Sequence, residues 1–304
     1  MLEHIICSHL MTHLENHNIL TNLQHGFRAK HSCESQLLIT THDIMNMYDR
    51  KQQVDIAILD FSKAFDTVPH KKLLYKLESY GVNTELLTWI NSFLTKRTQC
   101  VVVEGKTSSS VRVESGVPQG TCLGPILFLI HINDLPLRVK STVRLFADDC
   151  LLYRTINSLE DHYQLQSDLQ SLEIWAKEWG MSFNAKKCYI LGVSRSKKPN
   201  TYIYQLCDTI LEEVDNNPYL GVIISNSLKW SKHINKTVNK AHSTLGFLRH
   251  NLRKCPRSLK ITAYQSLVRS VLEYCSSIWD PHSQTDILSL EKIRRTIHNI
   301  GLLT

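Results

Sequence analysis

The sequence predicts a mixed α/β body followed by an all-helical, basic lobe. Three observations support this fold class. Short apolar runs of strand length recur before residue 225 and are separated by longer amphipathic stretches. After residue 225 only helical spacing of the apolar residues remains. That last stretch, residues 226–304, also carries 13 Lys and Arg against 4 Asp and Glu, so it holds all of the excess positive charge.

The first half of the body is predicted to be mainly helical. Its helices are expected over residues 1 to about 50 with a break at 24–30, then from 70 to a glycine at 81, and from 85 to 93. The largely apolar run at residues 54–59, which contains Asp55, is a predicted strand that ends on Asp60. Two Val-rich runs, residues 101–103 and 111–113, are expected to pair as a β-hairpin.

The second half is predicted to contain more strands. Apolar runs at 143–145 and 150–153 flank a hairpin tip, and one long amphipathic helix at 159–179 ends at a glycine. A strand or hairpin at 219–224 is expected to follow a turn at 215–218.

The C-terminal lobe is predicted to hold three helices. The first has a single apolar stripe, with spacings of three and four residues, from Ile234 to Leu252. Pro256 ends it, a second helix follows to residue 275, and a third begins after Pro281. Four basic residues fall off the stripe: Lys236, Lys240, Arg249 and Arg253. A basic helical lobe of this kind is suited to holding a phosphate backbone.

Composition narrows the class of protein. The 304-residue chain has ordinary hydrophobic and charged fractions of 42% and 21%, no apolar run of membrane-spanning length and no signal peptide. Its nine cysteines are scattered singly, without any Cys-x-x-Cys pair, which favours a reducing compartment and no structural zinc.

Three acids stand out because each is set at the end of an apolar strand. Asp148 and Asp149 lie in the tip Phe-Ala-Asp-Asp, and Asp60 ends a strand 88 residues earlier. Burying neighbouring carboxylates is costly unless cations balance them. If the fold brings these acids together, they make an oxygen-ligand site for two Mg²⁺ ions, which is the chemistry of nucleotidyl transfer.

A tight turn lies between the two strands in sequence. Residues 115–120 read Ser-Gly-Val-Pro-Gln-Gly and lead into an apolar helix in which Pro125 occupies the first turn. Such a backbone lets a base or sugar approach closely, and Gln119 can hydrogen-bond to it.

The ordered motifs resemble those of reverse transcriptases. The palm-like motifs are Asp-Phe-Ser-Lys-Ala-Phe-Asp at 60–66, Ser-Gly-Val-Pro-Gln-Gly at 115–120, Phe-Ala-Asp-Asp at 146–149, Asn-Ala-Lys-Lys at 184–187 and Tyr-Leu-Gly at 219–221. The non-LTR (LINE-type, jockey-like) retrotransposon branch is indicated by Gln-His-Gly-Phe-Arg at 24–28, Leu-Gly-Pro-Ile-Leu-Phe at 123–128, Ile-Asn-Asp-Leu-Pro at 132–136 and the stretch 272–281.

The resemblance implies an α+β right-hand polymerase: fingers, a palm with an antiparallel sheet, and a helical thumb. Residues 1–50 would be partial fingers, 51–225 the palm with finger insertions, and 226–304 the basic thumb with a C-terminal extension.

The resemblance also implies residue roles. Asp60, Asp148 and Asp149 would bind two Mg²⁺ ions, with Mn²⁺ as an alternative, and Lys187 would protonate the leaving pyrophosphate, with Lys186 beside it as the other candidate. The expected nucleotide- and template-binding residues are Phe65 as steric gate, Gln119, Gly120, Arg28 and Lys30. For Phe65 plain core packing is the alternative role, and Asp66 is expected to be a turn or cap acid. Tyr219, Leu220 and Gly221 would form the primer grip, and Lys236, Lys240, Arg249 and Arg253 would hold the nucleic-acid backbone.

The expected function is RNA-directed DNA polymerase, and the expected partners are an RNA template, a DNA primer, their hybrid and dNTPs. By the same resemblance, the chain is expected to begin after a finger segment of these elements, without their endonuclease domain, as part of a polyprotein found in nucleus and cytoplasm. One alternative is an N-terminally truncated remnant that binds RNA–DNA duplex without synthesis. Another is a group II intron-type maturase, which the branch-specific motifs disfavour.

Overall fold

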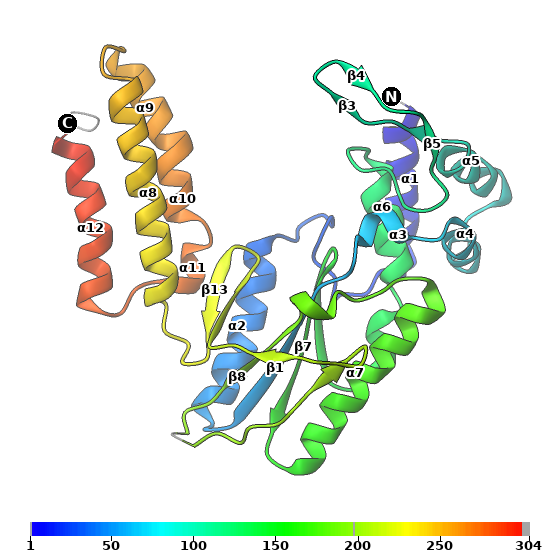
Figure 1. Ribbon diagram of the computed structural model, residues 1–304, viewed down its shortest axis with the longest axis horizontal. Helices are drawn as coiled ribbons and strands as arrows, with labels where there is room; N and C mark the ends of the chain where they lie inside the picture. Colours follow the sequence, from blue (N-terminus) through cyan, green and yellow to red (C-terminus); the bar gives the residue numbers. More distant parts are fainter. Residues whose placement is uncertain (1, 197, 300–304) are drawn as a thin grey trace.

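A five-stranded sheet forms the centre of the computed structural model, which describes residues 2–196 and 198–299 (Figure 1). Its strand order is β11-β8-β1-β7-β6, and every pairing is antiparallel except that of β11 with β8. The strands are β1 (Gln53–Leu59), β6 (Thr142–Phe146), β7 (Asp149–Ile156), β8 (Tyr189–Val193) and β11 (Glu212–Glu213). The predicted strand before Asp60 and the predicted hairpin at 143–153 are both present.

The alternation of side chains along β1 divides the apolar residues into two clusters. Ala57 and Leu59 belong to one cluster, whereas Val54 and Ile56 belong to the other. The first cluster is covered by α1 (Leu2–Asn16), α4 (His70–Ser79), α5 (Thr84–Leu94), α6 (Leu123–Ile132) and α7 (Leu159–Trp179). The second is covered by α2 (Cys33–Asp49), by the hairpin of β12 (Asn216–Tyr219) with β13 (Val222–Ser225), and by the C-terminal helices. Figure 1 shows α2 and α7 on opposite sides of the sheet.

The C-terminal lobe is helical, as predicted. Its elements are α8 (Ser231–Asn251), α9 (Arg257–Tyr264), a π-helical turn (Gln265–Arg269), α10 (Ser270–Glu273), α11 (Ser276–Trp279) and α12 (Gln284–Asn299). The apolar stripe of α8 is buried from Ile234 to Leu248, and Leu252 is half-buried. In Figure 1 this lobe and the group of α1, α4, α5 and α6 rise on two sides of the sheet. Residues 300–304, the end of the predicted thumb extension, lie outside the described residues.

Helix boundaries follow the signals in the sequence. Helix α7 begins with a capping box, in which Ser158 and Asp161 exchange hydrogen bonds between side chains and backbone, and it ends at Gly180 with φ of +75°. Gly81, with φ of +81°, directly follows Tyr80, the C-cap residue of α4. The break in the N-terminal helical region lies between α1 and α2, and it contains the predicted interruption at 24–30.

The pairing predicted for the Val-rich runs is wrong. Residues 102–103 (β3) pair with Lys106–Thr107 (β4), and Val111–Arg112 (β5) pairs with Thr98–Gln99 (β2). All of these strand residues are exposed, so no buried face fixes their register.

The turn predicted at 215–218 is also wrong, because residues 216–219 form β12. Pro218 is tolerated since it lies in a two-stranded hairpin, opposite Ile223. The turn lies instead at Leu220 and Gly221, whose φ values are +46° and +85°. The predicted end of the first lobe helix also differs, because α8 ends at Asn251 and Pro256 precedes α9 instead.

The remaining short elements connect the larger ones. They are α3 (Ala64–Thr67), the 3-10 turns Leu135–Arg138 and Ala185–Lys187, and the hairpin of β9 (Gln205–Leu206) with β10 (Thr209–Ile210). In the part of the chain that the structure describes, no helix is long and apolar enough to cross a bilayer.

Candidate active site

The register of the sheet brings the three acids together. Leu59 of β1 is opposite Cys150 of β7, so Asp60 follows β1 at the level of Asp149. Asp148 belongs to the two-residue tip between β6 and β7, because Phe146 pairs with Asp149. The sheet therefore gathers at one end the carboxylates that the sequence holds 88 residues apart.

The carboxylates repel one another electrostatically. Desolvation, then the charges of Asp148 and Asp60, raise the pKa of Asp149 to about 6. Desolvation likewise raises the pKa of Asp60, with Lys187 opposing that shift and Asp148 adding to it. A group of acids that resists ionisation in this way would be stabilised by a bound cation.

The segment around Lys187 is fixed to the same end of the sheet. The backbone N–H of Asn184 donates to the carbonyl of Asp60 at 2.8 Å, and the N–H of Asp60 contacts the thiol of buried Cys188 at 3.3 Å. Lys187 is exposed, and its charge lowers the pKa of Asp60. Of the two adjacent lysines, Lys187 is therefore the one that influences the acid group.

The turn at 115–120 packs against α3, the short helix that follows Asp60 in the chain. Gly116 has φ of +85°, and a Cβ there would lie 2.6 to 2.8 Å from the backbone of Asp66. The exposed Gln119 amide donates to the Asp66 carboxylate at 3.1 Å, so Asp66 orients Gln119. Gly120, with φ of +79°, has open space where a side chain would be.

Phe65 is half-buried beside this turn. Its ring stacks on Phe128 with centroids 4.4 Å apart and meets Phe27 edge-on at 6.3 Å. Its carbonyl accepts the N–H of Val117 at 2.8 Å. The ring thus has a packing role, and its half-burial leaves part of it accessible.

A family model described as "Reverse transcriptase (RNA-dependent DNA polymerase)" matches residues 2–224. The chain belongs to the reverse transcriptase family. Among curated relatives, it is 28% identical to "RNA-directed DNA polymerase from mobile element jockey" of Drosophila funebris, over 97% of this chain and 33% of the relative. It is 27% identical to "Probable RNA-directed DNA polymerase from transposon X-element" of Drosophila melanogaster, over 98% of this chain and 34% of the relative. The chain therefore spans about a third of the length of these relatives.

Among solved structures, this reverse transcriptase is similar to telomerase from Candida tropicalis bound to a fragment of telomeric RNA. The TM-score is 0.54 at 9% identity, and the match covers 98% of this chain and 47% of the other. The likeness confirms the predicted right-hand polymerase fold. The limits of fingers, palm and thumb along the chain stay predictions.

Members of the family generally depend on divalent metal ions. Within residues 2–196 and 198–299, no three His, Cys, Asp or Glu side chains are close enough to enclose a metal ion. Asp60, Asp148 and Asp149 therefore do not enclose a metal ion, although the sheet brings them to the same end. Carboxylate oxygens are the donor type that Mg²⁺ prefers, and Mg²⁺ keeps several waters and commonly shares its coordination with substrate phosphates.

The two predicted finger cations of this reverse transcriptase are placed differently. Arg28 is half-buried and donates to the carbonyl of Thr21 at 2.8 Å, so it closes its own loop. Lys30 is exposed in a left-handed conformation with φ of +62°.

The predicted primer grip is the turn of the β12–β13 hairpin. Tyr219 is buried and accepts a hydrogen bond from the Gln36 amide at 3.3 Å. Desolvation is the main cause that raises the pKa of Tyr219, and the charge of Asp149 adds to it, so the hairpin lies near the acids. The carbonyl of Leu220 accepts the hydroxyl of Tyr274 at 2.9 Å, while Gly221 is exposed at the turn.

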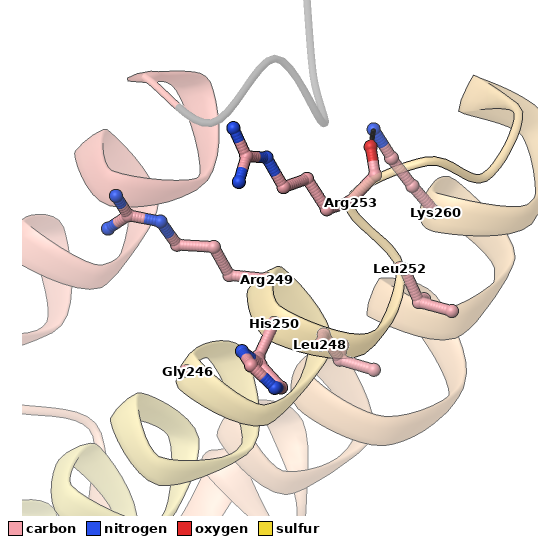
Figure 2. A pocket seen from close by; sticks show the side chains of 7 residues that line it. All are labelled: Gly246, Leu248, Arg249, His250, Leu252, Arg253 and Lys260. Atoms are coloured by element: carbon pink, nitrogen blue, oxygen red, sulfur yellow. Dashed lines mark hydrogen bonds between the residues drawn. The ribbon is translucent and has the colours of Figure 1, made fainter.

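The four predicted backbone-binding cations are exposed and form two pairs, with Lys236, Lys240 and Arg249 on α8 and Arg253 just beyond its end. Lys236 and Lys240 line a cavity of about 390 Å³ together with Gly221 of the hairpin turn. Arg249 and Arg253 line a second cavity of about 720 Å³. Figure 2 shows both arginines extending to the same side.

Sequence reasoning missed one residue of the site. Gln24 is buried and holds the backbone of Ala147, next to Asp148. The signal available in the sequence was the Gln-x-Gly pattern at 24–26, which served there only as a mark of resemblance.

Proposed function

We propose that this chain is the core of an RNA-directed DNA polymerase from a non-LTR retrotransposon. The observation that carries the proposal is the convergence of Asp60, Asp148 and Asp149 at one end of the sheet, in a chain of the reverse transcriptase family. The jockey relative is an RNA-directed DNA polymerase and the X-element relative a probable one, which supports the same activity.

Asp60, Asp148 and Asp149 would hold two Mg²⁺ ions, for which Mn²⁺ could substitute. Bound there, the ions supply charge neutralisation for the triphosphate and a lowered pKa for the primer 3′-hydroxyl. The chain contributes the ligand oxygens on a rigid sheet, so the reacting groups are positioned before reaction. Lys187, whose charge acts on Asp60, would protonate the leaving pyrophosphate.

The residues beside the acids would select the incoming nucleotide. Phe65 is proposed as the steric gate against a ribose 2′-hydroxyl, and its stacking on Phe128 would keep the ring in place. Gln119, oriented by Asp66, would contact the nucleotide or template together with Gly120, where the backbone is open to close approach. Lys30 is exposed and available to phosphates, whereas Arg28 would contribute chiefly by holding its loop.

The RNA–DNA hybrid is proposed to lie against the hairpin turn and α8. Tyr219, Leu220 and Gly221 would support the primer end, because this turn lies near Asp149. Lys236 and Lys240 border the same turn, Arg249 lies further along α8, and Arg253 lies two residues beyond the end of the helix. Residues 236 and 249 are about 20 Å apart along the helix axis, so the two pairs could contact phosphates several nucleotides apart.

Extension of a DNA primer on an RNA template, with Mg²⁺ and dNTPs, tests the proposal. We expect the parent chain to extend the primer and Asp148→Asn to abolish extension while binding of the hybrid stays intact. Asp49→Asn is the matched control, since Asp49 is an exposed acid whose surface ion pair with Arg195 contributes little to stability. Loss of both extension and hybrid binding in Asp148→Asn would show a structural role for Asp148.

A non-catalytic hybrid-binding module is the second candidate. The exposed cations of α8 favour it, because they can bind phosphates even if the three acids do not catalyse nucleotidyl transfer. Tight hybrid binding by the parent without any extension would select this candidate over the polymerase.

A further inference from the structure

The tip that carries Asp148 contains a residue in a conformation that needs external support. Ala147 has φ of +52°, in the left-handed region that residues other than glycine rarely occupy. It is buried, with 7% of its surface exposed. The orientation of Asp148 depends directly on this backbone, because Asp148 is the next residue in the chain.

Gln24 supplies the support by binding both backbone polar groups of Ala147. Its side-chain oxygen accepts the N–H of Ala147 at 2.8 Å, and its side-chain nitrogen donates to the carbonyl of Ala147 at 3.2 Å. The same oxygen accepts the N–H of Gly26 at 2.7 Å. The side chain of Gln24 is only 2% exposed, so water cannot take its place in these bonds.

The backbone around Gln24 is fitted just as closely to the hairpin. The N–H of Leu145 donates to the carbonyl of Leu23 at 2.9 Å, and the N–H of His25 donates to the carbonyl of Leu145 at 3.0 Å. A Cβ at Gly26 would lie 2.3 Å from the nitrogen of Ala147, so only glycine allows this approach. The Gln-x-Gly pattern therefore has a physical reason at both of its defined positions.

The loop that carries Gln24 is itself anchored at its base. Asn133, at the end of α6, accepts the N–H of Thr21 at 2.8 Å and donates to the carbonyl of Ile19 at 2.7 Å. The Arg28 guanidinium donates to the carbonyl of Thr21 and closes the loop from its other side. The amide of Gln24 is thus presented from a fixed support.

From these contacts we propose that Gln24 is a positioning residue for the acid group: it holds the tip at Ala147 so that the Asp148 carboxylate faces its partners for metal binding. The role of Asp148 as a ligand rests on the proposed function. The clamp on Ala147 goes beyond that function, because it makes a segment 123 residues away in sequence part of the catalytic geometry.

Gln24→Met is the test variant, because methionine keeps the length of the side chain but cannot make any of the three hydrogen bonds. Gln53→Met is a matched control. Gln53 is also buried, and its amide also makes three hydrogen bonds, to Asp55 and to both backbone groups of Asn200. Gln53 begins β1, the strand whose other end leads to Asp60, so it is remote from the acids. Gln24→Glu, which keeps the accepting oxygen, serves if Gln24→Met does not fold.

Hydrogen exchange gives a readout that is independent of activity. We expect the peptide that contains Ala147 to exchange at least tenfold faster in Gln24→Met than in the parent, and at the parent rate in Gln53→Met. An unchanged rate in Gln24→Met would overturn the clamp, whether or not the chain is a polymerase.

Primer extension at increasing Mg²⁺ concentration then tests the positioning role. We expect Gln24→Met to raise the half-saturating Mg²⁺ concentration at least fivefold, whereas Gln53→Met leaves it within twofold of the parent. If the parent extends the primer and the two variants behave alike, the positioning role is wrong and the proposed function stands. If the parent does not extend the primer, the proposed function fails, and hydrogen exchange still decides on the clamp.

Discussion

Replacing Lys76 with methionine should destabilise the protein strongly, because Lys76 is a buried cation with several partners. Only 3% of its surface is exposed. Its ammonium group donates to the carbonyl of His131 and forms an ion pair with Asp134. The ammonium also lies 3.6 Å from the centroid of the Trp179 ring. These contacts tie α4 to α6 and α7.

The magnitude follows from what Lys76→Met leaves behind. Breaking a buried ion pair by removing one partner costs about 3 to 5 kcal/mol. Asp134 keeps 22% exposure and still accepts the indole N–H of Trp175 at 3.2 Å, so water and Trp175 stabilise it in part. We therefore expect a loss near the lower limit, about 3 kcal/mol in the free energy of unfolding. For a chain of this size that corresponds to a melting temperature lower by about 5 °C.

Urea unfolding of the parent, Lys76→Met and the double variant Lys76→Met/Asp134→Asn provides the measurement. The double variant should regain about 1 kcal/mol, because it removes the unpaired charge. A loss below about 1 kcal/mol in Lys76→Met would refute the reasoning, since it would show that the ion pair only balances its own desolvation.

The pH dependence gives an independent check on Lys76. Burial is the main cause that lowers its pKa from 10.5 to about 8. Between these two pH values the unfolded chain binds the proton more tightly, so the Lys76 contribution to stability rises with pH. That rise should be missing in Lys76→Met.

Three further predictions concern other parts of the molecule. Burial is the main cause that lowers the pKa of His131 from 6.5 to about 3. The folded chain therefore loses stability against unfolding as pH falls below 6.5, and at pH 5 the loss from this residue is about 2 kcal/mol. His131→Leu should therefore reduce the difference in melting temperature between pH 7.5 and pH 5, and an unchanged difference would contradict this. Gly116→Ala should destabilise the chain by about 2 kcal/mol or more, because the added Cβ meets the backbone of Asp66 at 2.6 Å and the backbone is left-handed; thermal unfolding checks it, and a neutral result would count against the close approach. The double variant Lys236→Gln/Lys240→Gln should lower the slope of log K against log salt for hybrid binding by about 2, and an unaltered slope would remove both lysines from the phosphate contacts.

The sequence was sufficient to predict the structure wherever burial and local geometry favour the same conformation. The run at 54–59 is apolar at every position except Asp55 because both faces of β1 are covered, and Asp60 and Asp149 could be recognised as acids at strand ends. Gly180 ends α7 because the left-handed cap there favours glycine. In such places a single residue type has one dominant physical role.

The sequence was insufficient to predict the structure where no buried face fixes the register of a strand, or where the contacting residues are distant in sequence. The strands between residues 98 and 112 are exposed, so their register depends on turns that the Val pattern does not reveal. The role of Gln24 depends on Ala147, and the packing of α11 on α2 joins segments more than 200 residues apart. Contacts of this kind are set by the tertiary fold.

The second apolar cluster has a consequence for dividing this chain into shorter pieces. The match to the family model ends at residue 224, whereas the cluster that begins with Leu37 and Val54 continues through Leu245 and Trp279 to Ile293. A piece cut at the end of the family match would expose the apolar side chains of α2 and β13, against which α11 and α8 pack. Such a surface promotes aggregation. The smallest piece that folds cooperatively should therefore reach into α12, well past Gly221, the last residue of the palm-like motifs.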